Sequence, residues 1–143
     1  MEYNHLIPEL SVADFEKSLS FYTDVLGFQI EYQRVEHQFA LLSYQGSQIM
    51  LEQINDVWKA GKVEYPFGRG INFQILVDNV EVIIASLRDH GYLLMVEPET
   101  HWYRKENLLV GQHEFLVMDP NGYVLRFSQQ LGTKQSDETG GTL

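Results

Sequence analysis

The fold is decided by VADFEKSLSFYTDVLG at residues 12–27, which has a counterpart in VDNVEVIIASLRDHG at residues 77–91. Each stretch begins with a valine, has an acidic residue close behind, and carries apolar residues at helical spacing until a glycine ends it. A second pair recurs as well, because residues 39–46 match residues 115–122 with identical spacing. The chain therefore contains one motif twice.

Strand-like segments surround both helical stretches. Period-two alternation and turn residues place them at residues 6–12, 28–34, 39–44 and 48–54 in the first copy, and at 71–77, 92–96, 114–118 and 123–128 in the second. This order predicts an α+β fold in which two tandem β-α-β-β-β modules form an open, cup-shaped mixed sheet. The concave face of such a cup is the natural place for a ligand.

The same patterns set the expected boundaries. We expect a first module over residues 1–54, a linker over 55–70, a second module over 71–131 and a disordered tail over 132–143. The linker mixes charged, aromatic and glycine residues without a sustained period, and the tail lacks apolar anchors. Within the second module, the polar residues 97–111 are expected to form a loop.

Composition narrows the class of partner. The 143 residues are 44% hydrophobic, which suits one compact unit, and 10 basic against 20 acidic residues give a net charge of −10. That sign disfavours nucleic acid and anionic membranes. The absence of cysteine excludes disulfides, thiolate nucleophiles and cysteine-ligated zinc. With no apolar leader at the amino terminus, the sequence predicts a cytoplasmic protein.

Two longer stretches carry a resemblance to a known family. PELSVADFEKSLSFYTDVLGF (residues 8–28) and HEFLVMDPNGYVLRFSQQLG (residues 113–132) resemble the vicinal oxygen chelate superfamily, which includes glyoxalase I, bleomycin resistance proteins and extradiol dioxygenases. The nearest branch is the bleomycin resistance group, and the resemblance covers roughly residues 5–132. It implies the two-module cup, while the motifs are not specific for one activity.

The resemblance also locates the metal ligands of metal-dependent members, on the first and last strands of each module. These positions hold Ile7, Glu52, Asn72 and Arg126 here. An alkyl group has no lone pair, a neutral amide is a weak ligand, and a guanidinium repels a metal. Glu52 is the only such ligand retained, so we predict no metal, no cofactor and no catalytic residue.

A polar and aromatic lining remains. Alternation places Glu9, Glu52, Asn72, Gln74 and Arg126 on the concave face, where Glu52 and Arg126 either contact a ligand or pair with each other. Trp102 and Tyr103 are expected in the polar loop at the groove, and Trp58 and Phe67 are expected to pack the linker or a dimer surface. The predicted ligand-binding residues are Phe39, Glu52, Asn72, Gln74, Trp102, Tyr103 and Arg126.

The resemblance adds an arrangement of subunits. Resistance proteins of this branch are dimers that exchange the amino-terminal strand and hold the drug unchanged in two grooves between subunits. Pro8 stands at the hinge proline and Phe39 at a stacking aromatic, whereas Val110 replaces a second stacking aromatic found in some members. A homodimer is therefore expected.

The leading functional hypothesis is a metal-free dimer that sequesters a cationic, partly aromatic small molecule, as in resistance to bleomycin-type glycopeptide antibiotics. An acidic protein raises the local concentration of a cation. The alternative is a metal-dependent lyase, isomerase or dioxygenase of the same superfamily. A third hypothesis is a scaffold or regulatory module with an empty cup.

Overall fold

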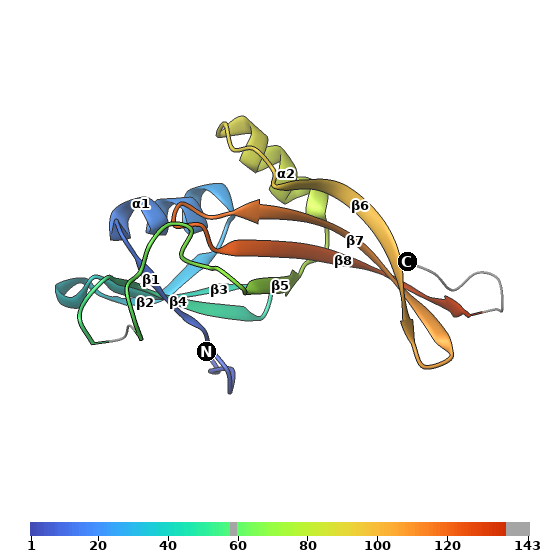
Figure 1. The fold of residues 1–143 in the computed structure, drawn as a ribbon, viewed down its shortest axis with the longest axis horizontal. Coiled ribbons are helices and arrows are strands. Elements are labelled where there is room, and N and C mark those ends of the chain that lie inside the picture. The colour runs from blue at the N-terminus through green and yellow to red at the C-terminus, as the bar shows by residue number, and fades with distance from the viewer. Residues whose placement is uncertain (58–59, 137–143) are drawn as a thin grey trace.

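The computed structural model describes residues 1–57 and 60–136, and its two halves repeat one order of elements (Figure 1). The first half contains β1 (Glu9–Val12), α1 (Phe15–Ser20) with a π-helical turn (Phe21–Val25), β2 (Gln29–Arg34), a 3-10 turn (Val35–His37), β3 (Phe39–Tyr44) and β4 (Ser47–Gln53). The second contains β5 (Asn72–Leu76), α2 (Val80–Asp89), β6 (Val96–Lys105), β7 (Leu108–Met118) and β8 (Val124–Gln135).

Each half forms an open four-stranded mixed sheet. The strand orders are β1-β4-β3-β2 and β5-β8-β7-β6, with β1/β4 and β5/β8 parallel and the other pairs antiparallel. The predicted α+β fold with two tandem β-α-β-β-β modules is confirmed. The described residues between β4 and β5 contain neither a helix nor a strand.

Both helices begin at a side-chain cap. Asp14 accepts a hydrogen bond from the backbone N–H of Lys17 at 3.2 Å, and Asn79 accepts one from Glu81 at 3.0 Å. Such caps satisfy backbone donors that have no partner within the helix. No helix among the described residues has the length and apolar content needed to cross a membrane.

The duplicated residues make equivalent hydrogen bonds within each module. The Gln53 side-chain oxygen accepts from the N–H of Phe15 at 2.9 Å, and the Gln129 side-chain oxygen accepts from Val80 at 3.0 Å. Each glutamine lies in the last strand of its module, β4 or β8, and each donating N–H belongs to the first residue of a helix. The repeat seen in the sequence is therefore a repeat of contacts.

A second pair of equivalent bonds joins the modules to each other. Asn121, in the β7–β8 turn, accepts from the N–H of Ala13 at 2.9 Å, whereas Gln45, in the β3–β4 turn, accepts from Asp78 at 2.8 Å. The turn of each module thus binds the helix start of the other. We call these two bonds the reciprocal ties.

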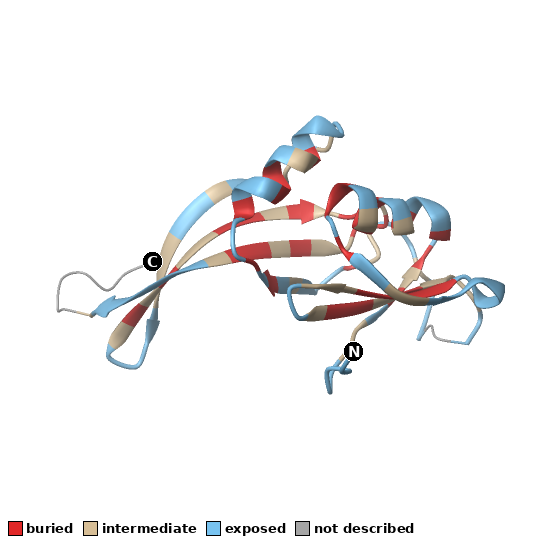
Figure 2. Ribbon diagram, turned by 180° about the vertical axis from the view of Figure 1, so that it is seen from behind, coloured by how far each residue is buried: buried red, intermediate tan, exposed pale blue. Residues whose placement is uncertain are grey.

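One apolar core lies beneath both helices. Buried residues of α1, α2 and the helix-facing sides of both sheets form a single cluster, which Figure 2 shows along the inner faces of the helices and the middle of the strands. Ser86 of α2 donates to the carbonyl of Val25 at 2.5 Å, which ties the two helical segments together. The faces of the two sheets that point away from the helices do not belong to this core.

The β7–β8 turn is buried against α1. Asp119 and Asn121 are 3% and 4% exposed. The Tyr22 hydroxyl donates to Asp119 at 2.7 Å, and the Asn121 amide donates to the Ser18 hydroxyl at 2.8 Å. Burial raises the pKa of Asp119 and, together with the charge of Asp119, raises that of Tyr22.

The expected strand at 92–96 and loop at 97–111 are wrong. Strands β6 and β7 instead form a long hairpin that extends away from the helices (Figure 1). Its turn places Glu106 at φ +57°. The segment is polar because much of the hairpin meets water, so it lacks the apolar alternation that marks a half-buried strand.

The tail expected to be disordered from residue 132 is partly strand, because β8 continues to Gln135. Thr133 and Lys134 pair with Val110 and Leu109 of the extended hairpin. The Lys134 ammonium also lies 4.0 Å from the centre of the Trp102 ring. The rest of the expected tail, residues 137–143, lies outside the described residues.

Replacing Asn121 with alanine should lower the free energy of unfolding by about 1–3 kcal/mol, because the partly buried N–H of Ala13 and the buried hydroxyl of Ser18 both lose their partner. Urea unfolding followed by circular dichroism measures the change. Asn107→Ala, at an exposed turn, is the control and should shift stability by less than about 0.5 kcal/mol. Equal effects of the two changes would refute the stabilising role of the turn.

Candidate functional site

The face of the second sheet that lies opposite α2 carries polar side chains. Arg126 of β8 pairs in register with Gln74 of β5 and Leu116 of β7. Neighbouring residues alternate between faces, so Phe115 and Phe127 point into the core while Arg126 points away from it. This polar surface is the concave face expected from the sequence.

Glu114 lies at the centre of that face and is only 6% exposed. Its carboxylate accepts from the Tyr103 hydroxyl at 2.5 Å and from the Ser128 hydroxyl at 2.8 Å. The Arg126 guanidinium lies 3.7 Å away. The two strands on either side of β7, β6 and β8, therefore supply the partners of one buried charge, which fixes all four side chains in place.

Tyr103 is a neutral donor in this arrangement. Burial raises the pKa of its hydroxyl, and the hydrogen bond and charge of Glu114 raise it further, against a smaller opposing effect of Arg126. The phenol therefore keeps its proton at neutral pH. It orients Glu114 and is unsuited to act as a base.

A cavity of about 320 Å³ opens over these residues. We call its polar lining, Gln74, Tyr103, Gln112, Glu114 and Arg126, the second-module site. Arg104 and Lys105 stand at its rim and are exposed. The volume falls within the range of small-molecule pockets, roughly 300–1,000 Å³.

The matching face of the first sheet is acidic. Glu9 of β1 and Glu52 of β4 lie close together, and burial, the charge of Glu52 and a hydrogen bond with it all raise the pKa of Glu9. The positive charge of Arg34 opposes that rise. Glu52 also accepts from the Asn55 amide at 3.1 Å. We call Glu9 and Glu52 the carboxylate pair.

Phe39 lies on this first-module face but is almost fully buried. Its side chain is 2% exposed, and the Arg34 guanidinium lies 4.2 Å from its ring centre. In the single chain, one side of the ring is therefore occupied by a cation. A stacking ligand would have to displace Arg34.

The amino-terminal arm lies against its own chain. Gln48 donates to the carbonyl of Glu2 at 2.6 Å and accepts from the N–H of Asn4 at 2.8 Å. The first ladder bond to β4 beyond the arm runs from the N–H of Met50 to the carbonyl of Pro8 at 2.9 Å. Pro8 therefore stands where the arm meets the sheet.

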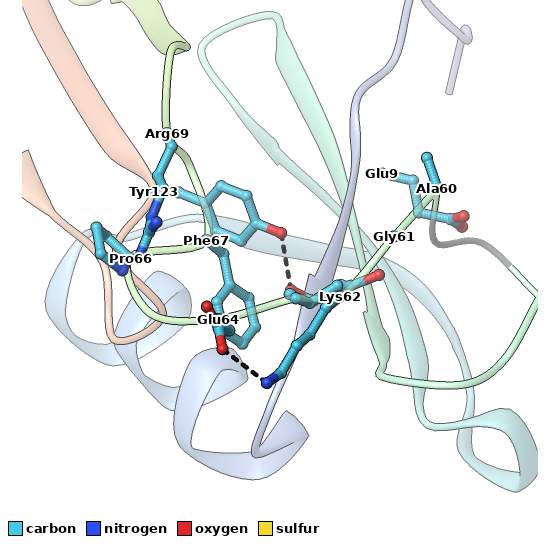
Figure 3. Close-up of a pocket in the computed structure, with 11 residues that line it drawn as sticks. Glu9, Ala60, Gly61, Lys62, Glu64, Pro66, Phe67, Arg69 and Tyr123 are labelled. Carbon is cyan, nitrogen blue, oxygen red and sulfur yellow. Dashed lines mark hydrogen bonds and ion pairs between the residues drawn. The ribbon is translucent and has the colours of Figure 1, made fainter.

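A further cavity of about 400 Å³ lies between β1 and the linker (Figure 3). Tyr123, on one wall, donates to the carbonyl of Ser11 at 3.0 Å, and an exposed ion pair joins Lys62 and Glu64 at 2.9 Å. Phe67, expected to pack the linker, contacts Tyr123 edge to face. Trp58 lies outside the described residues.

The structure brings together Gln74, Tyr103 and Arg126 among the predicted ligand-binding residues. Phe39 and Glu52 lie on the first-module face, and Asn72 lines an apolar groove beside the second-module site. The possible Glu52–Arg126 pair is not the one formed, because Arg126 pairs with Glu114.

Trp102 is separated from Tyr103, because neighbouring strand residues face opposite sides of a sheet. Its ring covers Gly111, where an added Cβ would lie 2.7 Å from the indole, and the Lys134 ammonium lies over the same ring. The expectation that both aromatics sit in one loop is therefore wrong. Glu114, Gln112 and Ser128 were missed, although alternation from Phe115 and Phe127 could have indicated the first and last.

The four positions that would hold a metal do not offer a fitting donor set. Ile7 has no donor atom, and Arg126 is a cation held by Glu114. Among residues 1–57 and 60–136, no three histidine, aspartate or glutamate side chains cluster as metal ligands do. The arrangement suits recognition of a molecule through hydrogen bonds and charge.

Replacing Glu9 with glutamine should stabilise the protein at pH 7 by about 0.3–1 kcal/mol, a range set by partial solvent screening. The pKa of Glu9 lies above its ordinary 4.5 in the folded chain, so folding favours the protonated form. Stability contributed by this group is complete at acidic pH and is lost as the pH rises through the raised pKa. Urea titrations at pH 3.5 and 7 measure the difference.

The stabilisation should vanish at pH 3.5, where Glu9 is protonated in both states. Glu36→Gln, at an exposed position of the 3-10 turn, is the matched control and should give the same small change at both values. A Glu9 variant whose stability followed the wild-type pH curve would contradict the role of burial and of Glu52.

Comparison with known proteins agrees with the fold. The chain is 27% identical over 138 residues to a bleomycin resistance protein of Geobacillus stearothermophilus, covering 87% of this chain and 96% of the relative. It is 28% identical over 127 residues to a probable lactoylglutathione lyase of Vibrio parahaemolyticus, covering 84% and 86%. An integron cassette protein of Vibrio cholerae has the same fold, with a TM-score of 0.65 at 21% identity over 90% of this chain and 97% of that one.

The family itself follows from a match that spans both modules. Residues 3–127 match the model described as the glyoxalase/bleomycin resistance protein/dioxygenase superfamily. The two open sheets, the duplicated order of elements and the polar concave faces are all consistent with that match. The chain belongs to the glyoxalase/bleomycin resistance protein/dioxygenase superfamily.

Proposed function

We propose that this protein binds and sequesters a cationic, partly aromatic small molecule without changing it, with bleomycin-type glycopeptides as the first candidates. Support comes from the relatives named bleomycin resistance protein, which match 87% of this chain. The observation that carries the proposal is the carboxylate pair, Glu9 and Glu52, on the first-module face. The Arg126–Glu114 pair on the second-module face bears on the absence of metal chemistry.

That pair argues against metal chemistry. Arg126 stands at a position where the resemblance places a metal ligand, and Glu114 holds its charge 3.7 Å away. A cation fixed at this place repels a divalent ion, and the repulsion is stronger than in water because the site is partly buried. Rearranging the pair would leave Glu114 buried without its countercharge.

The second-module site also lacks a free acid or base. Both oxygens of Glu114 accept hydrogen bonds from hydroxyl groups, and the raised pKa of Tyr103 keeps that hydroxyl neutral. These hydrogen bonds occupy the carboxylate oxygens that a general base would need to take a proton from a substrate. Such a wall favours binding over catalysis.

The carboxylate pair supplies the attraction for a cation. Glu9 and Glu52 lie together on the first-module face of a protein with net charge −10. A cationic group placed between them would relieve their mutual repulsion, which is one of the causes that raise the pKa of Glu9. The overall charge would speed its capture.

A metal-dependent lyase is the second candidate, and the named lactoylglutathione lyase relative favours it. That function requires donors beyond Glu52, the only family ligand retained. Elemental analysis of the purified protein and a glyoxalase assay separate the two candidates. Stoichiometric metal with turnover would replace the binding proposal.

The proposed assembly is a homodimer that exchanges its amino-terminal strand. The two modules form separate, open four-stranded sheets, and we expect a second copy to complete each of them into a full cup. The position of Pro8, where the arm meets β4, supports a hinge there.

Isothermal titration should give saturable binding of metal-free or copper-loaded bleomycin at micromolar protein. Glu52→Gln should weaken the affinity by about tenfold, because it removes one of two neighbouring carboxylates. Glu16→Gln, which removes the same charge from the exposed side of α1, is the control and should change the affinity less than about twofold. Absence of heat with the wild-type protein would end the bleomycin proposal.

Light scattering should find a dimer, and Pro8→Ala should raise its dissociation constant by about tenfold, because alanine frees the backbone that proline restricts at the hinge. Pro98→Ala, in the distant strand β6, is the control. A wild-type monomer at high concentration would contradict strand exchange.

A further inference from the structure

Two residues that line the second-module site each hold a buried side-chain atom without a partner. Within residues 1–57 and 60–136, Gln112 Oε1 and Arg126 Nε are inaccessible to water and form no hydrogen bond. Both residues line the same cavity of about 320 Å³. Buried polar groups are nearly always paired, so an unpaired acceptor and an unpaired donor at one cavity indicate a ligand that supplies both.

The cavity is positively charged within an acidic protein. Arg104, Lys105 and Arg126 line it against a single carboxylate, Glu114. That carboxylate already accepts two hydroxyl hydrogen bonds, so it leaves little acceptor capacity for a ligand cation. A negatively charged group fits this place, in contrast to the carboxylate pair of the first-module face.

An apolar groove continues from the charged end. Leu116, the register partner of Arg126, belongs to a cavity of about 380 Å³ that also includes Ile71, Met95, Met118 and Val124. Met95 is 51% exposed, which leaves flexible apolar surface for a ligand. Methionine side chains adapt to flat rings and contact them favourably.

We propose that the second-module site binds an organic carboxylate that carries an N–H donor near the acid and an apolar or aromatic group beyond it. Because both atoms are covered in the free chain, the Gln112 and Arg126 side chains turn toward the cavity when the ligand binds. The carboxylate then accepts from Arg126 Nε, the N–H donates to Gln112 Oε1, and the apolar group enters the groove beside Leu116. N-acyl amino acids have this chemistry. The site is additional to the capture of a cation proposed above and does not depend on it.

The probe is hippurate (N-benzoylglycine), titrated into the full chain by calorimetry. Two matched compounds isolate its features: hippuramide removes the negative charge, and O-benzoylglycolate replaces the N–H with an ester oxygen. Hippurate should bind saturably and about tenfold more tightly than either compound. Hippuramide loses the charge-assisted bond to Arg126, and O-benzoylglycolate leaves the Gln112 oxygen without a donor. Salt should weaken its binding, because Arg104 and Lys105 are exposed.

Two variants test the named atoms. Arg126→Lys keeps the charge beside Glu114 but loses Nε, and should weaken hippurate by about tenfold. Gln112→Met removes the acceptor, and should abolish the preference for hippurate over O-benzoylglycolate. Gln130→Met, the exposed register partner of Gln112, is the control and should leave both affinities unchanged. Thermal melting of each variant verifies folding, and Gln112→Met alone suffices if Arg126→Lys is unstable.

Saturable hippurate binding with these losses supports the site. Absence of hippurate binding, equal binding of hippuramide, or variants that behave like Gln130→Met would overturn it. The bleomycin titration is independent: bleomycin binding without hippurate binding refutes only the anion site, and the reverse result refutes only the proposed cation capture.

Discussion

The burial of one negative charge organises the second sheet. Glu114 is 6% exposed, and an unpaired carboxylate at that depth would cost several kcal/mol. Its partners are Tyr103 on β6 and both Ser128 and Arg126 on β8. Those contacts link β6, β7 and β8 on the concave face and hold the side chains of the second-module site in their positions.

The two concave faces differ in charge although the modules are copies. The first face presents Glu9 and Glu52, while the second presents Arg126 with two rim cations. A duplication keeps the backbone plan and the caps of each helix, and leaves the concave positions free to diverge because they do not support the core. One chain thus presents two concave surfaces of opposite charge.

Much of the fold could be predicted from the sequence because local signals agree with it. Asp14 caps α1, as its position before an apolar period indicated, and the duplicated glycine-ended stretches identified both modules. The site was harder. The hairpin of β6 and β7 is polar along most of its length, so nothing in its pattern distinguished it from a loop. Tyr103 was therefore expected in a loop, whereas it lies in strand β6. The partner of Arg126 depends on a cross-strand register that no local pattern encodes.

The reciprocal ties join residues that leave the ribosome at very different times. Ala13 and Asn121 are 108 positions apart, so the start of α1 lacks its acceptor until the last hairpin has been synthesised. Until then, the core residues of the first module that pack against the second module, in the cluster that includes Phe21 and Leu42, are only partly covered. A truncated chain that lacks the β7–β8 turn would present that surface to chaperones and proteases, so cellular quality control can distinguish finished molecules from unfinished ones.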